Sequence, residues 1–397
     1  MTAVTATADL ATGAPAASRE RGRLVGLDGI RGFAALFVVM HHCYLMAFPG
    51  FPANTGPAWL AWLLYGHISV VVFIVLSGFS LGVSPARSGW RLSSLSRFAH
   101  RRAWRILPPY WAALVFSLLI AWFVVPQPGS AAPTGKTVAV YGLLLQDVFG
   151  APNPNGAFWS IAVEAQLYLT FPLLLLVLRR WGPVAMVGGV SAIVMAMGLL
   201  WPHVHAIHLL MRLTPQFAAL FALGLAAAGI VVAGERIRRL PLQWLAALAA
   251  APVLVLLAVR GSVWWGTHMF WIDLAVGPAT ALLLAAVATR RPVPLVRLLD
   301  TRPVRSLGSF SYSLYLIHAP IVVAVNRKLV APHLGSGQAA FWVTFAIAVP
   351  LSVVVARLFG AVFEIPFVRH RSWAALRTAM RARLGRPEPV SEPSPSG

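Results

Sequence analysis

Cysteine, acidic residues and the common soluble-enzyme motifs are scarce or missing in this chain of 397 residues. A single cysteine, Cys43, excludes a disulfide framework and leaves the compartment open. Only 11% of residues are charged while 58% are hydrophobic, and the mean hydropathy of +0.75 excludes an ordinary soluble domain. The P-loop, the dinucleotide-binding GxGxxG and the zinc-binding HExxH are not found, so nucleotide hydrolysis and zinc proteolysis have no support. The composition instead indicates a polytopic membrane protein.

Apolar segments long enough to cross a bilayer recur along the chain and predict an all-α protein with about ten transmembrane helices. The expected spans are residues 27–48, 57–83, 106–125, 158–178, 183–201, 210–232, 241–259, 268–289, 307–326 and 338–362. Residues 137–149 are too short to cross and are predicted as an interfacial or re-entrant helix. We expect a membrane domain over residues 23–368, a disordered tail over 1–22, and a basic, then Pro/Ser-rich, disordered tail over 369–397.

Basic residues outnumber acidic ones by 32 to 11, which gives a net charge of +21. Such a charge is also found in nucleic-acid-binding proteins. Most of the Lys and Arg residues, however, fall in the tails and in alternate loops between the expected spans, which is the positive-inside pattern. We therefore expect both termini to be cytoplasmic, no nucleic-acid partner, and a multi-pass location in the plasma membrane with contacts to anionic lipids.

The first expected span carries ionisable residues inside an apolar sequence, LDGIRGFAALFVVMHHCY over residues 27–44. On a helix, Arg31 and His42 fall within about 20° of one face and roughly 16 Å apart along the axis, whereas His41 points about 100° away. Asp28 lies three residues before Arg31 and is placed to pair with it. A lone buried histidine is usually a packed core residue. An arginine and a histidine aligned inside a membrane segment favour a functional site.

Three arginines share a helical face in the stretch RFAHRRAWRILPPYW over residues 97–111. Arg101, Arg102 and Arg105 have no interleaved acids, so they favour an anionic partner. The alternative, a positive-inside stop with lipid headgroup contact, remains open from the charges alone. Pro108 and Pro109 are expected to end this element where the third span begins.

A carboxylate lies within the fourth expected span, where Glu164 and Tyr168 are one helical turn apart. A carboxylate at this depth is either neutral or paired, and Arg31 or a histidine is the expected partner. A simple helix–helix hydrogen bond is the alternative.

The ninth span adds Ser311, Tyr315 and His318 on one face, which favours a polar cavity inside the membrane. Single charges such as Asp273 and Glu364 are interpreted as packing ion pairs. The outer-loop histidines have no acidic or cysteine companions, so no metal site is expected.

Five segments, in order and at suitable spacing, resemble the acyltransferase 3 family of integral-membrane O-acyltransferases over about residues 24 to 360. They are LDGIRGFAALFVVMHH, VVFIVLSGFSLG, RRAWRILPPYW, FWSIAVEAQLYLTFP and SYSLYLIHAP. The resemblance implies a ten-span enzyme that transfers short acyl groups, usually from acyl-coenzyme A, to hydroxyls of glycans, lipids or glycosylated natural products. It also places the family's Arg-x10-His pattern on Arg31 and His42 and its Arg-x-x-Arg pattern on Arg102 and Arg105.

The expected mechanism uses His42 as the general base that deprotonates an acceptor hydroxyl, with Arg31 orienting it or stabilising the oxyanion. The arginine face holds the phosphates of acyl-coenzyme A, and no permanently bound cofactor is expected. The remaining polar residues complete the cavity: Asp28, Glu164, Tyr168, Ser311, Tyr315 and His318. Two alternatives stay open, a secondary transporter or exporter of a glycan or metabolite and a non-catalytic partner in glycan synthesis. The sequence leaves the acyl group, the acceptor and the acceptor's side of the membrane undetermined.

Overall fold

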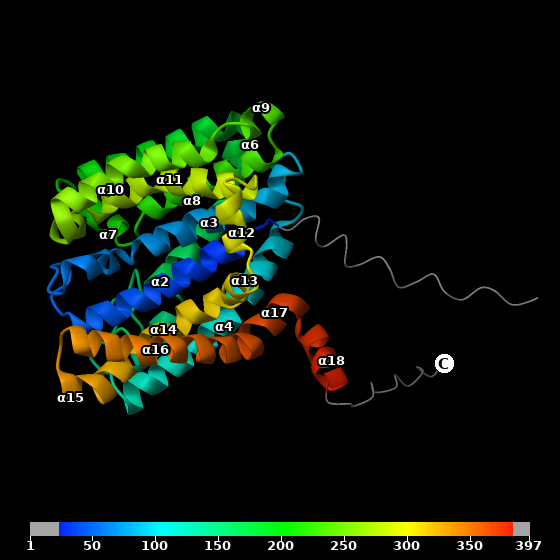
Figure 1. Cartoon of the computed structure of the whole chain (residues 1–397). Coiled ribbons are helices and arrows are strands. Elements are labelled where there is room, and N and C mark those ends of the chain that lie inside the picture. Colours follow the sequence, from blue (N-terminus) through cyan, green and yellow to red (C-terminus); the bar gives the residue numbers. More distant parts are fainter. Residues whose placement is uncertain (1–23, 384–397) are drawn as a thin grey trace, which may run out of the picture.

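The computed structural model describes residues 24–383, and every regular element in that range is a helix. The long helices are α2 (Leu27–Ala47), α3 (Ile68–Ala86), α4 (Leu95–Phe123), α6 (Trp159–Leu200), α8 (Gln216–Ala228), α10 (Leu242–Thr267), α11 (Met269–Ala288), α14 (Ser311–Ala324) and α16 (Gln338–Phe359). The shorter ones are η1 (Ala58–Tyr65), α5 (Gly135–Gly142), α7 (His205–Met211), η2 (Gly229–Val232), α9 (Glu235–Arg238), α12 (Val293–Leu299), α13 (Arg302–Ser309), η3 (Val325–Val330), α15 (Ala331–Leu334), η4 (Gly360–Glu364), α17 (Ile365–His370) and α18 (Trp373–Arg383). The long helices run roughly parallel to one axis (Figure 1). The chain is therefore an all-α, multi-pass membrane protein, as predicted.

Eight helices in residues 24–383 are long and apolar enough to cross a membrane, or nine if the bent pair of α7 and α8–η2 counts as one span. The helix α6 has 42 residues, and a straight helix of that length would be about 63 Å long, roughly twice the hydrocarbon thickness of a bilayer. It is interrupted at Gly182, whose φ of 83° and ψ of 174° are not helical. Each half has the length of one crossing, so the expected total of ten remains a prediction.

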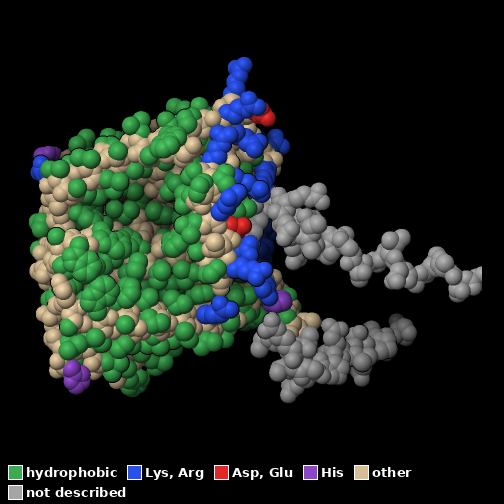
Figure 2. Space-filling view, viewed as in Figure 1, with side chains coloured by type: hydrophobic (Ala, Val, Ile, Leu, Met, Phe, Trp, Pro, Cys, Tyr) green, Lys and Arg blue, Asp and Glu red, His purple; other side chains and the backbone are tan. Residues whose placement is uncertain are grey.

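Lysine and arginine side chains gather at one end of the bundle, here called the basic end (Figure 2). The helix α2 begins at this end and α18 lies beside it (Figure 1). The start of α2 and the helix α18 thus lie at the same end of the bundle. The assignment of this side to the cytoplasm remains a prediction from the charge distribution.

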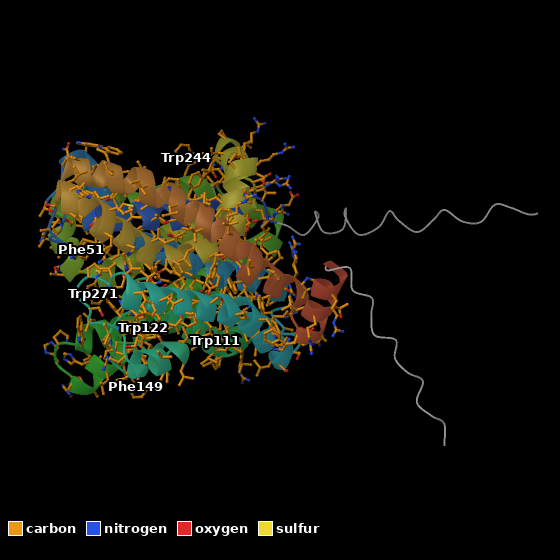
Figure 3. All side chains as sticks on the ribbon, turned by 90° about the horizontal axis from the view of Figure 1, so that it is seen from below. Phe51, Trp111, Trp122, Phe149, Trp244 and Trp271 are labelled. Atoms are coloured by element: carbon orange, nitrogen blue, oxygen red, sulfur yellow. The ribbon has the colours of Figure 1, made fainter. Side chains whose placement is uncertain are left out.

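Burial separates an enclosed group of helices from a peripheral one. The most apolar stretch of the span over Ser311–Leu334 is 72% buried and that over Ala58–Ala86 is 56% buried, against 17% for α6 and 22% for α10. Exposed aromatic side chains such as Trp111, Trp122 and Trp244 project from the outer surface (Figure 3). The peripheral helices therefore have the surface expected of lipid-facing segments, whereas the enclosed helices contact mainly protein.

Glycines allow α3 and α8 to pack backbone against backbone. A Cβ atom built on Gly78 would lie 2.2 Å from the carbonyl oxygen of Phe221, and one built on Gly224 would lie 2.0 Å from that of Val75. Small residues of this kind are typical of tight helix–helix contacts in membranes. The contact fixes α3, which carries much of the cavity described below.

The prediction that Pro108 and Pro109 end a helix is wrong, because α4 continues through both residues from Leu95 to Phe123. Proline is tolerated inside membrane helices when neighbouring groups and small local adjustments satisfy the freed backbone. The Tyr312 hydroxyl of α14 donates to the Ile106 carbonyl across 3.3 Å and holds α14 against this stretch of α4. The basic segment and the third span consequently form one continuous helix. The short helix expected between the third and fourth spans is present as α5, which is too short to cross.

The described part of the expected C-terminal tail is helical rather than disordered, since α17 continues to His370 and α18 follows. Trp373 packs against Trp104 of α4 with ring centroids 5.1 Å apart, and His100 contacts the Arg371 carbonyl oxygen at 2.7 Å. These contacts and a basic amphipathic sequence suit a helix lying at a membrane surface. The remaining tail residues, 384–397, and the expected N-terminal tail, 1–22, lie outside the described residues.

Candidate active site

A cavity of about 380 Å³ extends into the bundle from the basic end. Its walls come from α2, α3, α4, α6, α13 and α14 and from the η4–α17 segment. One face of α3 follows the cavity over ten residues, or about 15 Å of helix axis. The lining residues of this face are Val70, Phe73, Ile74, Ser77 and Ser80.

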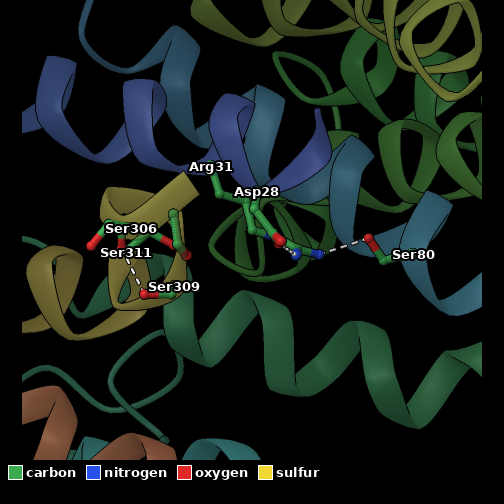
Figure 4. A network of polar contacts seen from close by, with 7 residues as sticks. Asp28, Arg31, Ser80, Ser306, Ser309 and Ser311 are labelled. Atoms are coloured by element: carbon green, nitrogen blue, oxygen red, sulfur yellow. Dashed lines mark hydrogen bonds and ion pairs between the residues drawn. The ribbon is translucent and has the colours of Figure 1, made fainter. Parts of the chain in front are cut away.

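Arg31 lies at the basic end of the cavity and is held there by two contacts (Figure 4). Its guanidinium donates to the carboxylate of Asp28 at 3.2 Å and to the hydroxyl of Ser80 at 2.7 Å. The predicted pair with Asp28 is therefore confirmed. Because Asp28 lies one turn toward the N-terminus, the guanidinium points away from His42, and the structure does not bring these two side chains together.

Arg102 and Arg105 also line the cavity, together with Arg369 from α17. The guanidinium of Arg102 lies 5.8 Å from the ring centroid of Tyr168, a cation–π contact. Arg101, predicted to act with Arg102 and Arg105, is exposed and is not among the lining residues. Four arginines, with Arg31, thus gather at the mouth of one cavity.

Glu164 lies midway along the cavity and is bonded to hydroxyls rather than to a cation. Its carboxylate accepts hydrogen bonds from Ser77 at 3.0 Å and from Tyr168 at 2.5 Å. The expected partner was Arg31 or a histidine, and no such hydrogen bond is present among the residues that the structure describes. The contact between α6 and α3 corresponds to the alternative of a helix–helix hydrogen bond.

The inner end of the cavity is lined by hydroxyl groups. The hydroxyls of Ser160 and Tyr315 lie 2.7 Å apart, joining α6 to α14. Ser311 lines the cavity nearer the basic end and donates to the carbonyl of Gly308 at 2.9 Å. The predicted polar face of the ninth span therefore does border the cavity.

His42 and His318 form a ring pair just beyond this inner end. Their ring centroids are 4.8 Å apart, and His42 Nδ1 lies 3.3 Å from His318 Nε2. Neither histidine is among the residues that line the cavity. The ring of His318 lies 5.8 Å from the ring of Tyr315, and Tyr315 does line the cavity. His41 points elsewhere, as predicted, with Nδ1 2.7 Å from the carbonyl oxygen of Leu63.

Helix geometry places His42 at the depth of the cavity's inner end. Because Arg31 and Ser80 are hydrogen-bonded, these residues of α2 and α3 lie at a similar height along the axis of the bundle. His42 lies eleven residues further along α2, and Val70 lies ten residues back along the antiparallel α3. At 1.5 Å per residue, both are about 15 to 16 Å from the basic end. The cavity therefore extends from the arginines to the depth of the imidazole pair.

Glu364 is a cavity residue that sequence reasoning missed, because it was interpreted as a packing ion pair. It ends the π-helical segment η4 and accepts from the Ser313 amide at 3.1 Å and the Ser313 hydroxyl at 2.6 Å. The local widening that turns it inward has no clear sequence signal. Ser77 and Ser80 were also missed, although two hydroxyls three residues apart within an apolar span were a usable signal.

A multi-pass helical bundle with an arginine-lined cavity that extends toward a pair of imidazoles defines a membrane protein with an internal reaction or binding chamber. The chain belongs to the acyltransferase 3 family, because the family model, described as an acyltransferase domain, matches residues 24–360. The resemblance inferred from five motifs is thereby confirmed, and the protein is an acyltransferase that transfers groups other than amino-acyl groups.

Curated relatives match along most of the chain at low identity. Nodulation protein 10 of Rhizobium leguminosarum bv. viciae is 25% identical over 93% of this chain and 98% of its own length. Acyltransferase MdmB of Streptomyces mycarofaciens is 27% identical over 94% of this chain and 97% of its own. The putative peptidoglycan O-acetyltransferase YrhL of Bacillus subtilis is 27% identical over 80% of this chain, which spans about half of that protein (50%). No solved structure matches this chain.

Proposed function

We propose that this protein is a plasma-membrane O-acyltransferase that moves an acyl group from acyl-coenzyme A to a hydroxyl of a carbohydrate or a glycosylated acceptor. The observation that carries the proposal is the continuous cavity between four arginines and the depth of the His42–His318 pair. Relatives named as O-acetyltransferases support the same class of reaction.

The basic end of the cavity suits the donor's phosphates. Arg102, Arg105 and Arg31 supply charge-assisted donors within one space, and Arg binds phosphate with a planar fork. We assign Arg31 to this role rather than to the oxyanion, because its guanidinium faces Asp28 and Ser80. An extended donor arm then places its thioester about 15 Å deeper, near His42.

His42 acts as the general base in this proposal. An imidazole of ordinary pKa, about 6.5, is largely neutral at pH 7 and can accept the proton of the acceptor hydroxyl. The hydroxyl oxygen attacks the thioester carbon, the carbon–sulfur bond breaks, and the leaving thiolate takes the proton from His42. The Tyr315 ring lies 5.8 Å from that of His318, and the paired hydroxyls of Tyr315 and Ser160 are therefore assigned to the developing oxyanion.

Thiol release by the purified protein tests the proposal. In detergent, where no gradient exists, acyl-coenzyme A and a panel of glycosylated acceptors are mixed with the protein while free thiol is followed. We expect acceptor-dependent thiol release that disappears in His42→Ala. Absence of thiol release across a broad acceptor panel, together with gradient-driven uptake of a glycan into vesicles, would contradict this proposal and indicate a carrier.

A further inference from the structure

Backbone carbonyls around His42 determine which of its ring nitrogens carries the proton. His42 Nδ1 lies 2.9 Å from the carbonyl oxygen of Val38, one helical turn earlier on α2. A carbonyl oxygen only accepts, so Nδ1 must be the protonated nitrogen that donates to it. The lone pair of the neutral ring is therefore on Nε2, which is the nitrogen that a general base needs.

The same argument determines the protonation of His318. Its Nδ1 lies 2.8 Å from the carbonyl oxygen of Tyr315 and 3.2 Å from that of Leu314, so Nδ1 carries the proton. Its Nε2 faces the Nδ1–H of His42 at 3.3 Å. If His318 were doubly protonated, two N–H groups would point at each other. His318 is therefore a neutral ring whose lone pair accepts from His42, which shares its Nδ1–H between Val38 and His318.

We propose that His318 is the positioning residue for His42: it orients the ring and stabilises the imidazolium that forms during the reaction. This inference rests on the proposed function of His42 as general base. The proton from the acceptor hydroxyl goes to His42 Nε2 and later to the thiolate, while the Nδ1 proton stays on His42 throughout. His318 takes up no proton; its Nε2 lone pair accepts a stronger hydrogen bond when His42 is charged.

The residues that the structure describes around the two rings include no other group placed to orient His42 through its Nδ1 and to stabilise its imidazolium in the way proposed for His318. Among the described residues, no carboxylate is hydrogen-bonded to either ring, and His318 is 0% exposed. The titratable neighbours are His41 on α2, which is bonded to the Leu63 carbonyl, and Tyr315 on α14, whose hydroxyl is paired with Ser160. In serine hydrolases an aspartate holds the histidine at the equivalent nitrogen. Here a neutral imidazole occupies that place, which avoids burying a further charge in the membrane.

Three variants measure the contribution of the His318 lone pair. His318→Phe removes the acceptor and keeps a ring, and we expect kcat to fall roughly ten- to a hundredfold with the KM for acyl-coenzyme A unchanged. His318→Gln restores an acceptor oxygen and is expected to recover much of the loss. His41→Phe is the matched control, because it removes a neighbouring buried imidazole that makes no hydrogen bond to His42, and its kcat is expected to stay close to wild type.

A structural role alone predicts a different pattern. Both His318 variants would then lose thermal stability and activity together, and the glutamine variant would show no recovery. Full kcat in His318→Phe, alongside an inactive His42→Ala, would overturn this inference and leave the proposed function standing. Activity in His42→Ala would overturn the proposed function itself.

Protonation of the wild-type rings can be read without any change to the site. Solid-state 15N NMR of histidine-labelled protein in lipid bilayers distinguishes protonated from unprotonated ring nitrogens, and His42→Asn serves only to assign the signals. We expect a proton on Nδ1 and none on Nε2 in both rings near pH 7.5. A proton on Nε2 of His42, or on both nitrogens of His318, would contradict the proposal even if the variants fail to fold.

Discussion

The enclosed span Ala58–Ala86 and the peripheral helix α10 are almost equally apolar, yet they are built differently. The most apolar stretches of Ala58–Ala86 and of α10 have mean hydropathies of 2.1 and 2.2, but the first stretch is 56% buried and the second is 22% buried. The enclosed set contains Arg31, His42 and His318 and close-packed glycines, while α10 exposes large aliphatic residues. Hydropathy therefore identifies the spans, and the position of polar and small residues identifies which spans enclose the site.

The largest expected effect is at the imidazole pair, inside the enclosed set. His42→Ala should lower acyl transfer by at least about 10²-fold, because it removes the general base. His41→Ala should retain much of the activity, since the His41 ring is bonded to the Leu63 carbonyl and not to His318. Thiol-release rates, normalised to inserted protein, provide the measurement. Equal losses in the two variants would contradict the assignment.

The second effect is at the cavity mouth, where lining and non-lining arginines can be compared on one helix. The double variant Arg102→Ala/Arg105→Ala should weaken acyl-coenzyme A binding by a few kcal/mol, at about 1.5–3 kcal/mol for each charge-assisted hydrogen bond. Arg101→Ala is the matched control, because Arg101 is exposed and outside the cavity. Calorimetric titration at several salt concentrations measures both. Unchanged affinity for acyl-coenzyme A in the double variant would indicate that Arg102 and Arg105 contact lipid headgroups and do not bind the donor.

The third effect compares packing in the two sets through glycine substitutions. Gly224→Ala should destabilise the protein by about 1–3 kcal/mol, because the new Cβ would meet the Val75 carbonyl of α3. Gly188→Ala, on the peripheral half of α6, adds a methyl group with nothing within 4 Å and should be neutral or slightly stabilising. Thermal unfolding in detergent distinguishes them. A destabilising Gly188→Ala would show that this half of α6 is packed against a partner.

The smallest effect is at Asp147, outside the spanning helices in the segment between α5 and α6. Burial raises the pKa of Asp147 from 3.8 to about 6, although the Gln166 side chain donates to it at 3.0 Å and Arg212 attracts it. The folded state then binds this proton more tightly than the unfolded chain, so stability falls as pH rises from about 4 to about 6.

Asp147→Asn should remove that slope, with a change below about 1 kcal/mol because water screens a partly exposed carboxyl. Unfolding midpoints between pH 4 and pH 7 measure it. An identical pH slope in the variant and the wild type would assign the dependence to another group.

The helical class and the charged cavity residues of α2, α4 and α6 were predictable from the sequence, because charged residues stand out against an otherwise apolar sequence. Three features were not predictable. The direction of the Arg31 guanidinium depends on Ser80, which is 49 residues away in the sequence. The continuation of α4 through Pro108 and Pro109 and the inward turn of Glu364 after a π-helical segment depend on tertiary packing, which local propensity does not record.

The central claim is that one cavity holds the donor with its phosphates at the arginines and its thioester at the imidazole pair. A coenzyme A thioester with a short photoreactive acyl group tests this directly, through mass-spectrometric mapping of the labelled peptides. We expect labelling on α2 near His42 and on α14 near His318, and competition by unlabelled acyl-coenzyme A. Labelling confined to lipid-facing α10, or labelling that acyl-coenzyme A does not displace, would contradict the account.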